Sequence, residues 1–574
     1  MTCPSRLQSN NFILIKIFLA ILIVLGFGLR FYKPAADPPQ WSYIFNTDEG
    51  HYSYNTLNKA KDGKWFLDEA KYALVTPLFS VAQYLIGLIF HDQPNIVRYR
   101  AISVLSGIIS CLLIAFIVDG KWIRLSAVAL LSMSFIGTVH SRLGISEIML
   151  TLFFQLTVLL AWQAYQRNFF LISFLTGLSA IGCLTIKPTG VIILPVILLA
   201  PLICDSPGNN RKLYWKGVIS GFISGILLWS IIIVVPNWNE WQNMMVTTMS
   251  FGKNSISYAP VQITKSYLKF FLSPALHTMP LLWPLALFWC AIFFLAKFRN
   301  RKNTFLDSLL FLWLIFGIGS LGSALYQPGR WQLFLFPPVI ISGLRFLQLN
   351  PRAFVIYFSF LFAGSLSVIY SIFWTGQFLE VGGQIHPEYG LFSHVVPATL
   401  AFFVFFVTYH IIKKFSRESC QAIAYAVIVL ELSVQCTFHL ALMVPSYYRQ
   451  SQWTNIAADM EKLMNKKEDI ITGDMVQNLA LYAVVHVLPT FYVLDENDDK
   501  SIKKFYLSQN RIPTYIMLAD FKHKYWWKNS PKFMKSLQEV QKYSLFIGDV
   551  GWRVFRIYRI KSYEWLYSHD NLAS

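Results

Sequence analysis

The chain has 574 residues, of which 55% are hydrophobic and only 14% charged, and its mean hydropathy is +0.46. A soluble protein of this length would form several domains and carry about a quarter charged residues, so the composition excludes an ordinary soluble enzyme. The net charge of +19 does not indicate a nucleic-acid partner, because most of the surplus Lys and Arg lies in short clusters between apolar segments.

Apolar segments recur along the first three quarters of the chain, from residue 12 to about residue 444. Each is about 17 to 25 residues long, which is enough for a helix to cross the hydrocarbon core of a bilayer. The first segment, 12–29, has no small-residue cleavage signal at its end. We therefore expect a retained first helix rather than a signal peptide, within a polytopic α-helical membrane protein.

The Lys and Arg clusters predict how the chain is oriented, because cytoplasmic loops of membrane proteins carry an excess of these residues. The clusters lie at 121–124, 167, 211–216, 297–302, 345–352 and 413–417. By alternation, we expect the non-cytoplasmic side to hold the segments 140–147, 187, 237–273 and 326–330. Everything after the last membrane helix is expected on that side too.

An acidic pair, Asp48 and Glu49, lies in the stretch NTDEGHYSY at 46–54. Its side of the membrane depends on the apolar segment 74–90, which is short and is interrupted by a proline and several polar residues. Such a segment suits a helix that lies at the interface better than one that spans. We therefore expect about thirteen transmembrane helices within residues 1–445, and an external loop at 33–96 that carries the acidic pair.

The composition changes after Pro445, where Lys, Asp and Glu become frequent. Helices are expected at 453–467 and 476–485, and strands at 469–473, 490–495, 514–520, 543–549 and 552–560. This alternation predicts a small soluble α/β domain at 446–574, with a largely parallel sheet. The region has no GxGxxG motif that would indicate a nucleotide, and no cysteine follows Cys436, so we expect no disulfide framework there.

Further polar residues fall on the same predicted face as the acidic pair. They are His140, Arg142, Glu147, Lys187, Tyr326 and Arg330. Ionisable groups at membrane depth are costly, so they usually pair with one another or serve a site. Acids and bases that converge on one face could hold an anionic group and activate a hydroxyl. The plainer interpretations are a solvated loop for the acidic pair, and snorkelling of the lysine and arginine to the interface.

The order and spacing of these motifs resemble the membrane glycosyltransferases of the GT-C class. The closest resemblance is to the branch that contains the protein O-mannosyltransferases and the aminoarabinose transferase of lipid A. It covers most of residues 10 to 345, and each motif is weak alone. The motifs are the early Asp-Glu pair, TPLFSVAQYLIGLIF (76–90), RYRAISVLSGI (98–108), SRLGISE (141–147), LTIKPTGVIILP (184–195) and GRWQLFLFPP (329–338). The chain departs from the family in having Glu147 where an aspartate is usual.

The resemblance implies transfer of a sugar, with inversion, from a polyprenyl-phosphate carrier to an acceptor outside the membrane. It implies Asp48 as the base, with Glu49 beside it in the catalytic pair. Lys187 and Arg330 could stabilise the phosphate that leaves. The remaining substrate-binding residues are then Tyr52, Arg142, Glu147 and Tyr326. A divalent metal held by Glu49, Glu147 and a histidine is conceivable, but this chemistry does not need one, so we expect no cofactor.

Three other functions stay open. A transporter or lipid flippase would also gather charges in a membrane cavity, although it usually shows broken helices in repeated halves. A polysaccharide polymerase or ligase uses lipid-linked donors, but its key residues lie in a late external loop. A membrane scaffold with a binding ectodomain is the third. The acceptor could be a lipid, a glycan or a protein, and we expect the inner (plasma) membrane of a bacterium as the location.

Overall fold

The structure is a computed structural model, and it describes most of the helical region and much of the C-terminal part. The described residues are 5–36, 46–67, 71–204, 208–253, 281–298, 304–323, 329–349, 417–443, 452–465, 468–473, 476–483, 485–489, 512–519, 535–547 and 551–563, together with 264, 266, 267, 270, 279 and 447. Tyr326 and the expected strand 490–495 lie outside these residues, and the side chain of Asp48 is not described.

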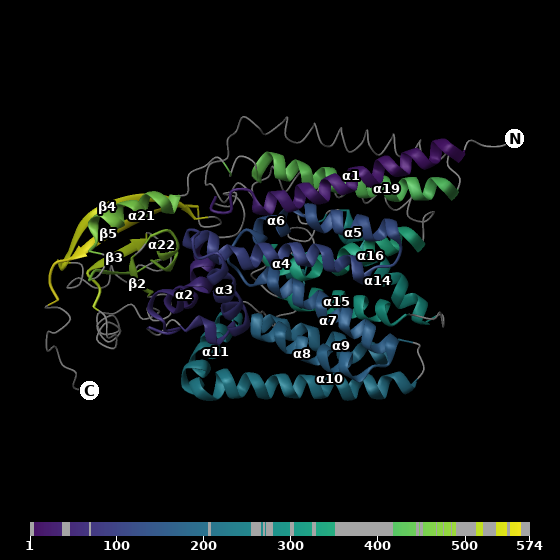
Figure 1. Cartoon of the computed structure of the whole chain (residues 1–574), viewed down its shortest axis with the longest axis horizontal. Coiled ribbons are helices and arrows are strands. Elements are labelled where there is room, and N and C mark those ends of the chain that lie inside the picture. Colours follow the sequence, from purple (N-terminus) through teal and green to yellow (C-terminus); the bar gives the residue numbers. More distant parts are fainter. Residues whose placement is uncertain are drawn as a thin grey trace.

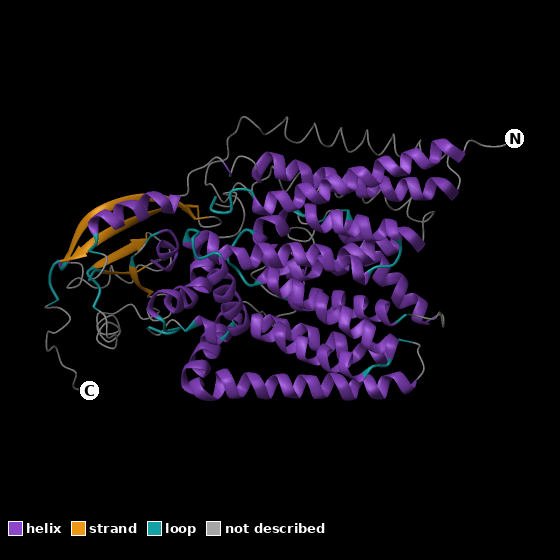
Figure 2. Ribbon diagram, viewed as in Figure 1, coloured by secondary structure: helices purple, strands orange, loops and turns teal. Residues whose placement is uncertain are grey.

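Helices make up the first and larger part of the described chain (Figure 2). The α-helices are α1 (Ser5–Phe31), α2 (Asn46–Asp62), α3 (Pro77–Ile89), α4 (Asn95–Ile117), α5 (Lys121–Met133), α6 (Phe135–Ser141), α7 (Glu147–Arg167), α8 (Phe170–Ile186), α9 (Ile193–Ile203), α10 (Gly208–Trp229), α11 (Trp238–Lys253), α14 (Leu282–Phe298), α15 (Phe305–Gly322), α16 (Phe336–Leu349), α19 (Arg417–Phe438), α21 (Gln452–Leu463) and α22 (Val476–Tyr482). The shorter helical turns are η1 (Tyr72–Leu74), η2 (Pro188–Ile192), η3 (Ser230–Val234), η4 (Val235–Asn237), η6 (Gly329–Leu335) and η8 (His439–Met443).

Several of these helices have the length and composition of membrane spans. Within the described residues, four are long and apolar enough, and a fifth is added if the bent pair α5 and α6 counts as one span. The four are Asn95–Ile117, Glu147–Arg167, Asn210–Val246 and Phe305–Gly322. The third runs without interruption from α10 into α11, so the segment expected as a loop from residue 237 begins as a helix. The count of thirteen spans stays a prediction.

The bent pair α5 and α6 turns by 60° at Ser134. Breaking a helix inside a membrane leaves backbone groups that need new partners. Arg30 donates to two carbonyls in the last turn of α5, and His439 Nε2 donates to a third. At the start of α6, the amide of Phe135 donates to the side chain of Gln435, and Ser134 caps the first turn. The backbone groups that the bend frees therefore have hydrogen-bond partners. After the bend, α6 leads into the loop that precedes α7.

The short helices α2 and α3 lie at one end of the helical bundle, beside the C-terminal strands (Figure 1). The ring of Tyr52 in α2 packs edge-on against Tyr72 of η1 and Phe79 of α3, with centroids 5.1 Å and 5.7 Å apart. At 13 residues, α3 is too short to cross a bilayer. This length agrees with the expectation that 74–90 does not span.

The strands among the described C-terminal residues form one five-stranded sheet of order β2-β1-β3-β5-β4. The strands are β1 (Ile470–Gly473), β2 (His486–Pro489), β3 (Tyr515–Ala519), β4 (Leu537–Ile547) and β5 (Gly551–Ile560). β1 pairs in parallel with β2 and β3, whereas β5 pairs antiparallel with β3 and β4. The expectation of a largely parallel sheet is therefore wrong, because half of the pairings are antiparallel. β4 and β5 are joined by only three residues, and parallel neighbours need a crossover of a dozen or more.

Candidate active site

The acidic pair lies in the first turn of α2, at the end of the bundle that faces the C-terminal sheet. Asp48 belongs to the described helix, but its side chain lies outside the described residues. Glu49 is buried, with an exposed fraction of 1%. The carboxyl group of Glu49 is therefore held inside the protein.

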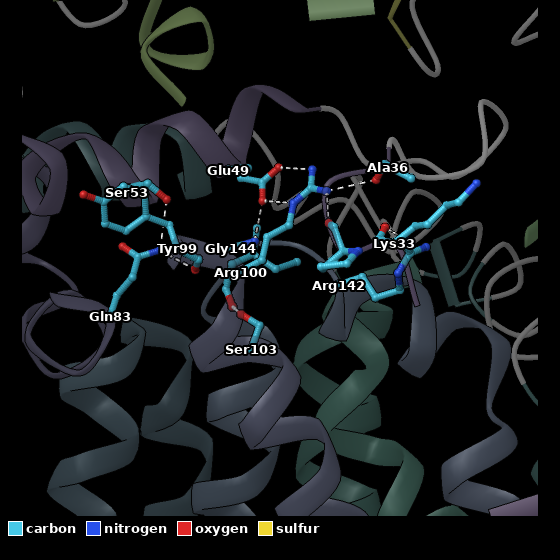
Figure 3. A network of polar contacts seen from close by, with 12 residues as sticks. Lys33, Ala36, Glu49, Ser53, Gln83, Tyr99, Arg100, Ser103, Arg142 and Gly144 are labelled. Atoms are coloured by element: carbon cyan, nitrogen blue, oxygen red, sulfur yellow. Dashed lines mark hydrogen bonds and ion pairs between the residues drawn. The ribbon is translucent and has the colours of Figure 1, made fainter. Parts of the chain in front are cut away.

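Arg100 of α4 holds the carboxylate of Glu49 through two parallel hydrogen bonds (Figure 3). Its Nε lies 2.7 Å from Oε1, its Nη2 lies 2.8 Å from Oε2, and both side chains are at most 1% exposed. The remaining guanidinium nitrogen, Nη1, donates to the carbonyls of Pro34 and Ala36. A buried charge needs such full pairing to be tolerated. The pair therefore ties α2, α4 and the end of α1 together.

The backbone amide of Gly144 adds a third donor to Glu49, at 2.7 Å from Oε1. A Cβ at this position would lie 3.1 Å from the carbonyl oxygen of Tyr99 and 3.2 Å from side-chain atoms of both Gln83 and Ser53. Glycine therefore lets the loop between α6 and α7 approach α2 this closely. Gln83 itself joins α3 to α2 and α4, because its Nε2 donates to Ser53 Oγ and to the carbonyl of Tyr99 (Figure 3).

Arg142 follows α6 and points away from Glu49, toward the chain that leaves α1 (Figure 3). Its Nη2 donates to the carbonyls of Tyr32 and Lys33, and its guanidinium lies 4.4 Å from the ring centroid of Tyr447. Burial lowers the pKa of Arg142 to about 10, so it stays charged at neutral pH. These partners favour a structural role for a residue that the sequence suggested as substrate-binding.

A second cluster brings together Glu147, Lys187 and Arg330, which are far apart in the sequence. Lys187 Nζ lies 2.6 Å from Glu147 Oε1, and Arg330 Nε lies 3.3 Å from the same oxygen. The exposed fractions of the three side chains are 4%, 14% and 9% in chain order. With two cations and one carboxylate, the cluster carries a net positive charge inside the protein.

Local backbone structure explains how each member of this cluster is presented. Glu147 is the first residue of α7, and Lys187 ends α8, where Pro188 begins a tight turn. Arg330 lies in η6, which packs against both α6 and α7. The Nζ of Lys187 also lies 5.9 Å from the ring centroid of Trp331. Three separate breaks between helices therefore supply the three charges.

The loop between α6 and α7 connects the two clusters. It carries Arg142 and Gly144, which bind the end of α1 and Glu49, and it ends at Glu147. Its Ile145 carbonyl accepts a hydrogen bond from Ser103 of α4 (3.0 Å). The structure therefore brings Glu147, Lys187 and Arg330 together, whereas Glu49 pairs with Arg100. Their roles as site residues stay a prediction.

Arg100 is the residue of this site that the sequence analysis did not single out. It lies inside RYRAISVLSGI, the stretch that supports the family resemblance, and it is a charged residue near the start of a 23-residue apolar helix. Such a charge requires a partner, and that requirement was the signal available. As for metal sites, the described part of the chain contains no group of three or more His, Cys, Asp or Glu side chains that could hold an ion.

Comparison with known proteins identifies the fold. No protein-family model and no curated protein matches the chain. Among solved structures, ArnT from Cupriavidus metallidurans bound to undecaprenyl phosphate is 14% identical, with a TM-score of 0.55 over 96% of this chain and 98% of that one. The apo form of that protein is 15% identical, with a TM-score of 0.54 over 96% of this chain and 98% of that one. The arabinofuranosyltransferase AftD from Mycobacteria is 12% identical, with a TM-score of 0.42, over 95% of this chain and 42% of that one.

The likeness to ArnT extends over nearly the whole of both chains, so it concerns the complete architecture rather than one bundle of helices. ArnT is a lipid A aminoarabinose transferase of the GT-C class. The resemblance that the ordered sequence motifs indicate is thereby confirmed at the level of fold. This chain has the GT-C glycosyltransferase fold.

Proposed function

We propose that the protein transfers a sugar from a polyprenyl-phosphate-linked donor to an acceptor on the outer face of the membrane, with inversion at the sugar. The acceptor would be a hydroxyl or phosphate of a lipid, a glycan or a protein. The GT-C fold supports this proposal, and so does the undecaprenyl phosphate bound in the ArnT structure. The family resemblance supplies the expectation that the reaction inverts the sugar.

The observation that carries the proposal is the cluster of Glu147, Lys187 and Arg330. Its two cations share a single carboxylate oxygen and are largely removed from water. Electrostatic interactions are stronger in such surroundings than in water, so an anion placed between the cations would be held firmly. A phosphate that gains negative charge as the sugar leaves would be stabilised more than the intact donor, which is the requirement for catalysis.

The acceptor needs a base, and α2 supplies the candidate. The carboxylate of Glu49 is occupied by Arg100 and by the amide of Gly144, with one donor on Oε2 and two on Oε1. We therefore assign the base to Asp48 and a positioning role to Glu49. Tyr52 packs within the aromatic group beneath α2 and would hold this helix in place. Tyr326 remains a proposed substrate contact from the resemblance alone.

The experiment measures transfer of labelled sugar from a panel of undecaprenyl-phosphate-linked sugars by protein purified in nanodiscs. Membranes from a strain that lacks the protein serve as the acceptor source. Lys187→Ala and Arg330→Ala should each lower kcat/KM by about one to two decades, since a lost charge-assisted contact costs about 1.5–3 kcal/mol. Arg330→Lys should recover part of the loss, because it keeps the charge but not the planar fork of donors.

The chain offers a matched control in Lys71, which pairs with Glu240 at 3.0 Å on a partly exposed surface. Lys71→Ala should change turnover by less than about two-fold, since exposed ion pairs contribute little. Wild-type activity in a Lys187/Arg330 double alanine variant would show that these cations do not serve the reaction. Absence of transfer by the wild-type protein from every lipid-linked sugar would favour a transporter or flippase instead.

A further inference from the structure

His140 in α6 presents a buried nitrogen that has no partner. Its Nδ1 lies 2.7 Å from the carbonyl oxygen of Ile136. A carbonyl oxygen can only accept a hydrogen bond, so Nδ1 carries the proton in this contact, and in the neutral ring Nε2 holds a lone pair. The side chain is 1% exposed, and Nε2 makes no hydrogen bond. The ring therefore offers a single hydrogen-bond acceptor at a fixed position.

Glu147 and Ser146 present unpartnered oxygens at the neighbouring start of α7. Glu147 uses Oε1 for both Lys187 and Arg330, while its Oε2 makes no hydrogen bond. The hydroxyl of Ser146, which is fully buried, also lacks a partner. His140 belongs to α6, which packs against both α7 and η6, the turn that carries Arg330. Two acceptors and one hydroxyl are thus presented by α6 and by the start of α7, which pack against each other.

Leaving buried polar atoms unpaired is costly, and most such atoms in folded proteins have a partner in the protein, in water or in a ligand. Three unpaired atoms on adjacent elements therefore indicate a place that a polar molecule completes. The two defined acceptors, Nε2 of His140 and Oε2 of Glu147, require a molecule that donates hydrogen bonds. The net positive charge of Lys187, Arg330 and Glu147 together favours one that also carries negative charge. A sugar bound to a phosphate has both properties.

We propose that His140, Ser146 and Glu147 form the subsite that recognises the hydroxyl groups of the donor sugar, next to the phosphate held by Lys187 and Arg330. This inference rests on the proposed function and assigns to His140 a binding role of its own. The hydroxyls of the sugar donate to Nε2 and to Oε2. Reaching these atoms requires a neighbouring segment to move, and η6 packs across α6 and α7 while it also carries Arg330. Phosphate and sugar would then be bound by the same rearrangement.

Two substitutions of His140 distinguish the contribution of its Nδ1 from that of its Nε2. Asn at this position can still donate from its side-chain amide to the carbonyl of Ile136, but it has no atom where Nε2 lies. Gln is longer and can place an amide oxygen near the position of Nε2, so it restores an acceptor. His140→Asn should therefore lose recognition of the sugar while the helix stays intact, and His140→Gln should recover part of it.

The measurement is binding to nanodisc-embedded protein of undecaprenyl phosphate, alone and linked to mannose, glucose, galactose or arabinose. Wild-type protein should bind at least one sugar-linked lipid more tightly than the bare lipid. His140→Asn should weaken that complex by about ten-fold, as expected for one hydrogen bond lost to a buried group, and leave binding of the bare lipid unchanged. Lys187→Ala should weaken binding of both lipids, because it acts on the phosphate.

Three results would overturn the inference. The wild type could show no preference for any sugar-linked lipid, or His140→Asn could keep the preference in full. The preference could also vanish on addition of EDTA, which would place a metal ion on His140 and Glu147. The experiment distinguishes a failure of this inference from a failure of the proposed function. A sugar preference that depends on His140 without any transfer would contradict the glycosyltransferase, whereas transfer with an unaltered preference in His140→Asn would contradict the subsite.

Discussion

At the scale of single residues, Glu49 in the first turn of α2 is held by three hydrogen-bond donors. Glu49 receives three hydrogen bonds from groups that are themselves buried, and its removal would leave Arg100 uncompensated. A buried carboxylate that already accepts three hydrogen bonds, two of them from an arginine, is poorly placed to take a proton from a substrate, because most of its lone pairs are engaged. Asp48 is therefore the better candidate for the base, as the resemblance to the GT-C class implies.

The two proposed roles, a base for Asp48 and a positioning residue for Glu49, predict opposite outcomes for two conservative substitutions. Asp48→Asn should lower kcat by about 10²–10⁴-fold, the usual contribution of a positioned base, with little change in thermal stability. Glu49→Gln should destabilise the protein by on the order of 3 kcal/mol, because the charge of Arg100 loses its buried partner, and should reduce turnover less. Sugar transfer and detergent-based thermal unfolding of both variants measure this. An Asp48→Asn enzyme with normal activity would contradict the assignment of the base to Asp48.

The sequence was enough to predict that Glu147, Lys187 and Arg330 lie close together, but it was not enough to predict the partner of Glu49. The convergence of Glu147, Lys187 and Arg330 could be expected, because unpaired charges at membrane depth are expensive. The partner of Glu49 could not be read in the same way, since Arg100 is 51 positions away and several lysines lie closer in sequence. Partner choice here depends on how α2 lies across α4, which is a tertiary property.

At the scale of elements, α2 is the contact between the helical bundle and the C-terminal sheet. Tyr54 and Leu57 of α2 and two residues of α4, Ile96 and Tyr99, share one buried cluster with α21, α22 and the strands. The hydroxyl of Tyr54 donates to the carbonyl of Val487 in β2 at 3.2 Å. The helix that carries Asp48 is thus fixed from one side by Arg100 and from the other by the C-terminal sheet.

Loosening this contact should therefore affect catalysis. Leu57→Ala should cost about 2–5 kcal/mol of local stability, as for other buried large-to-small changes. It should lower kcat more than it raises KM for the donor, because the cations that we propose to bind the phosphate, Lys187 and Arg330, are not part of α2. Tyr54→Phe, which removes only the hydroxyl, should have a smaller effect in the same direction. The rate of amide hydrogen exchange of residues 46–62, measured alongside turnover, should rise more in Leu57→Ala than in Tyr54→Phe.

The exposed Lys61 provides the control for this series. Its Nζ lies 3.5 Å from His486 Nδ1 at the rim of the same contact, and exposed polar contacts of this kind contribute little. Lys61→Ala should leave both exchange and turnover close to wild type. Unchanged exchange in Leu57→Ala would mean that the sheet does not steady α2.

The helical nature of α2 could not have been predicted from its pattern. Residues 46–54 were expected in an external loop, because the segment 74–90 was not expected to span. The stretch is polar and lacks the apolar periodicity of an amphipathic helix. In the structure, its small polar side chains are themselves buried: Ser53, Asn55 and Thr56 are at most 1% exposed. Asn55 Oδ1 accepts from the amide of Ala73, and Thr56 donates to the carbonyl of Ser80. Polar packing against η1 and α3 replaces the apolar stripe.

At the scale of the whole molecule, the composition was enough to predict a helical membrane region followed by a mixed helix and strand region. The sequence predicted the parallel pairs of the sheet but not its antiparallel pairs. β1 and β2 are joined through α22, a crossover long enough for parallel strands, whereas the three residues between β4 and β5 permit only an antiparallel pair. The GT-C resemblance supplied what composition could not, since it depends on the order of weak motifs along the chain.

The arrangement of the molecule also predicts its orientation in the membrane. α2 contacts the C-terminal sheet, so both must lie on the same side, whichever side that is. α4 begins at this contact and rises about 33 Å over its 23 residues, so the start of α5 lies on the opposite side. The basic residues at 121–124 predict that this opposite side is the cytoplasm.

We therefore expect single cysteines at two exposed positions, Asp62→Cys in α2 and Ser544→Cys in β4, to react with a membrane-impermeant maleimide in intact cells. Lys121→Cys at the start of α5 should react only after permeabilisation, and all three are introduced into a cysteine-free background. Labelling of one of the first two without the other would contradict the contact between α2 and the sheet. Labelling of Lys121→Cys alone would place the acidic pair in the cytoplasm, and the donor would then have to be used on the inner face.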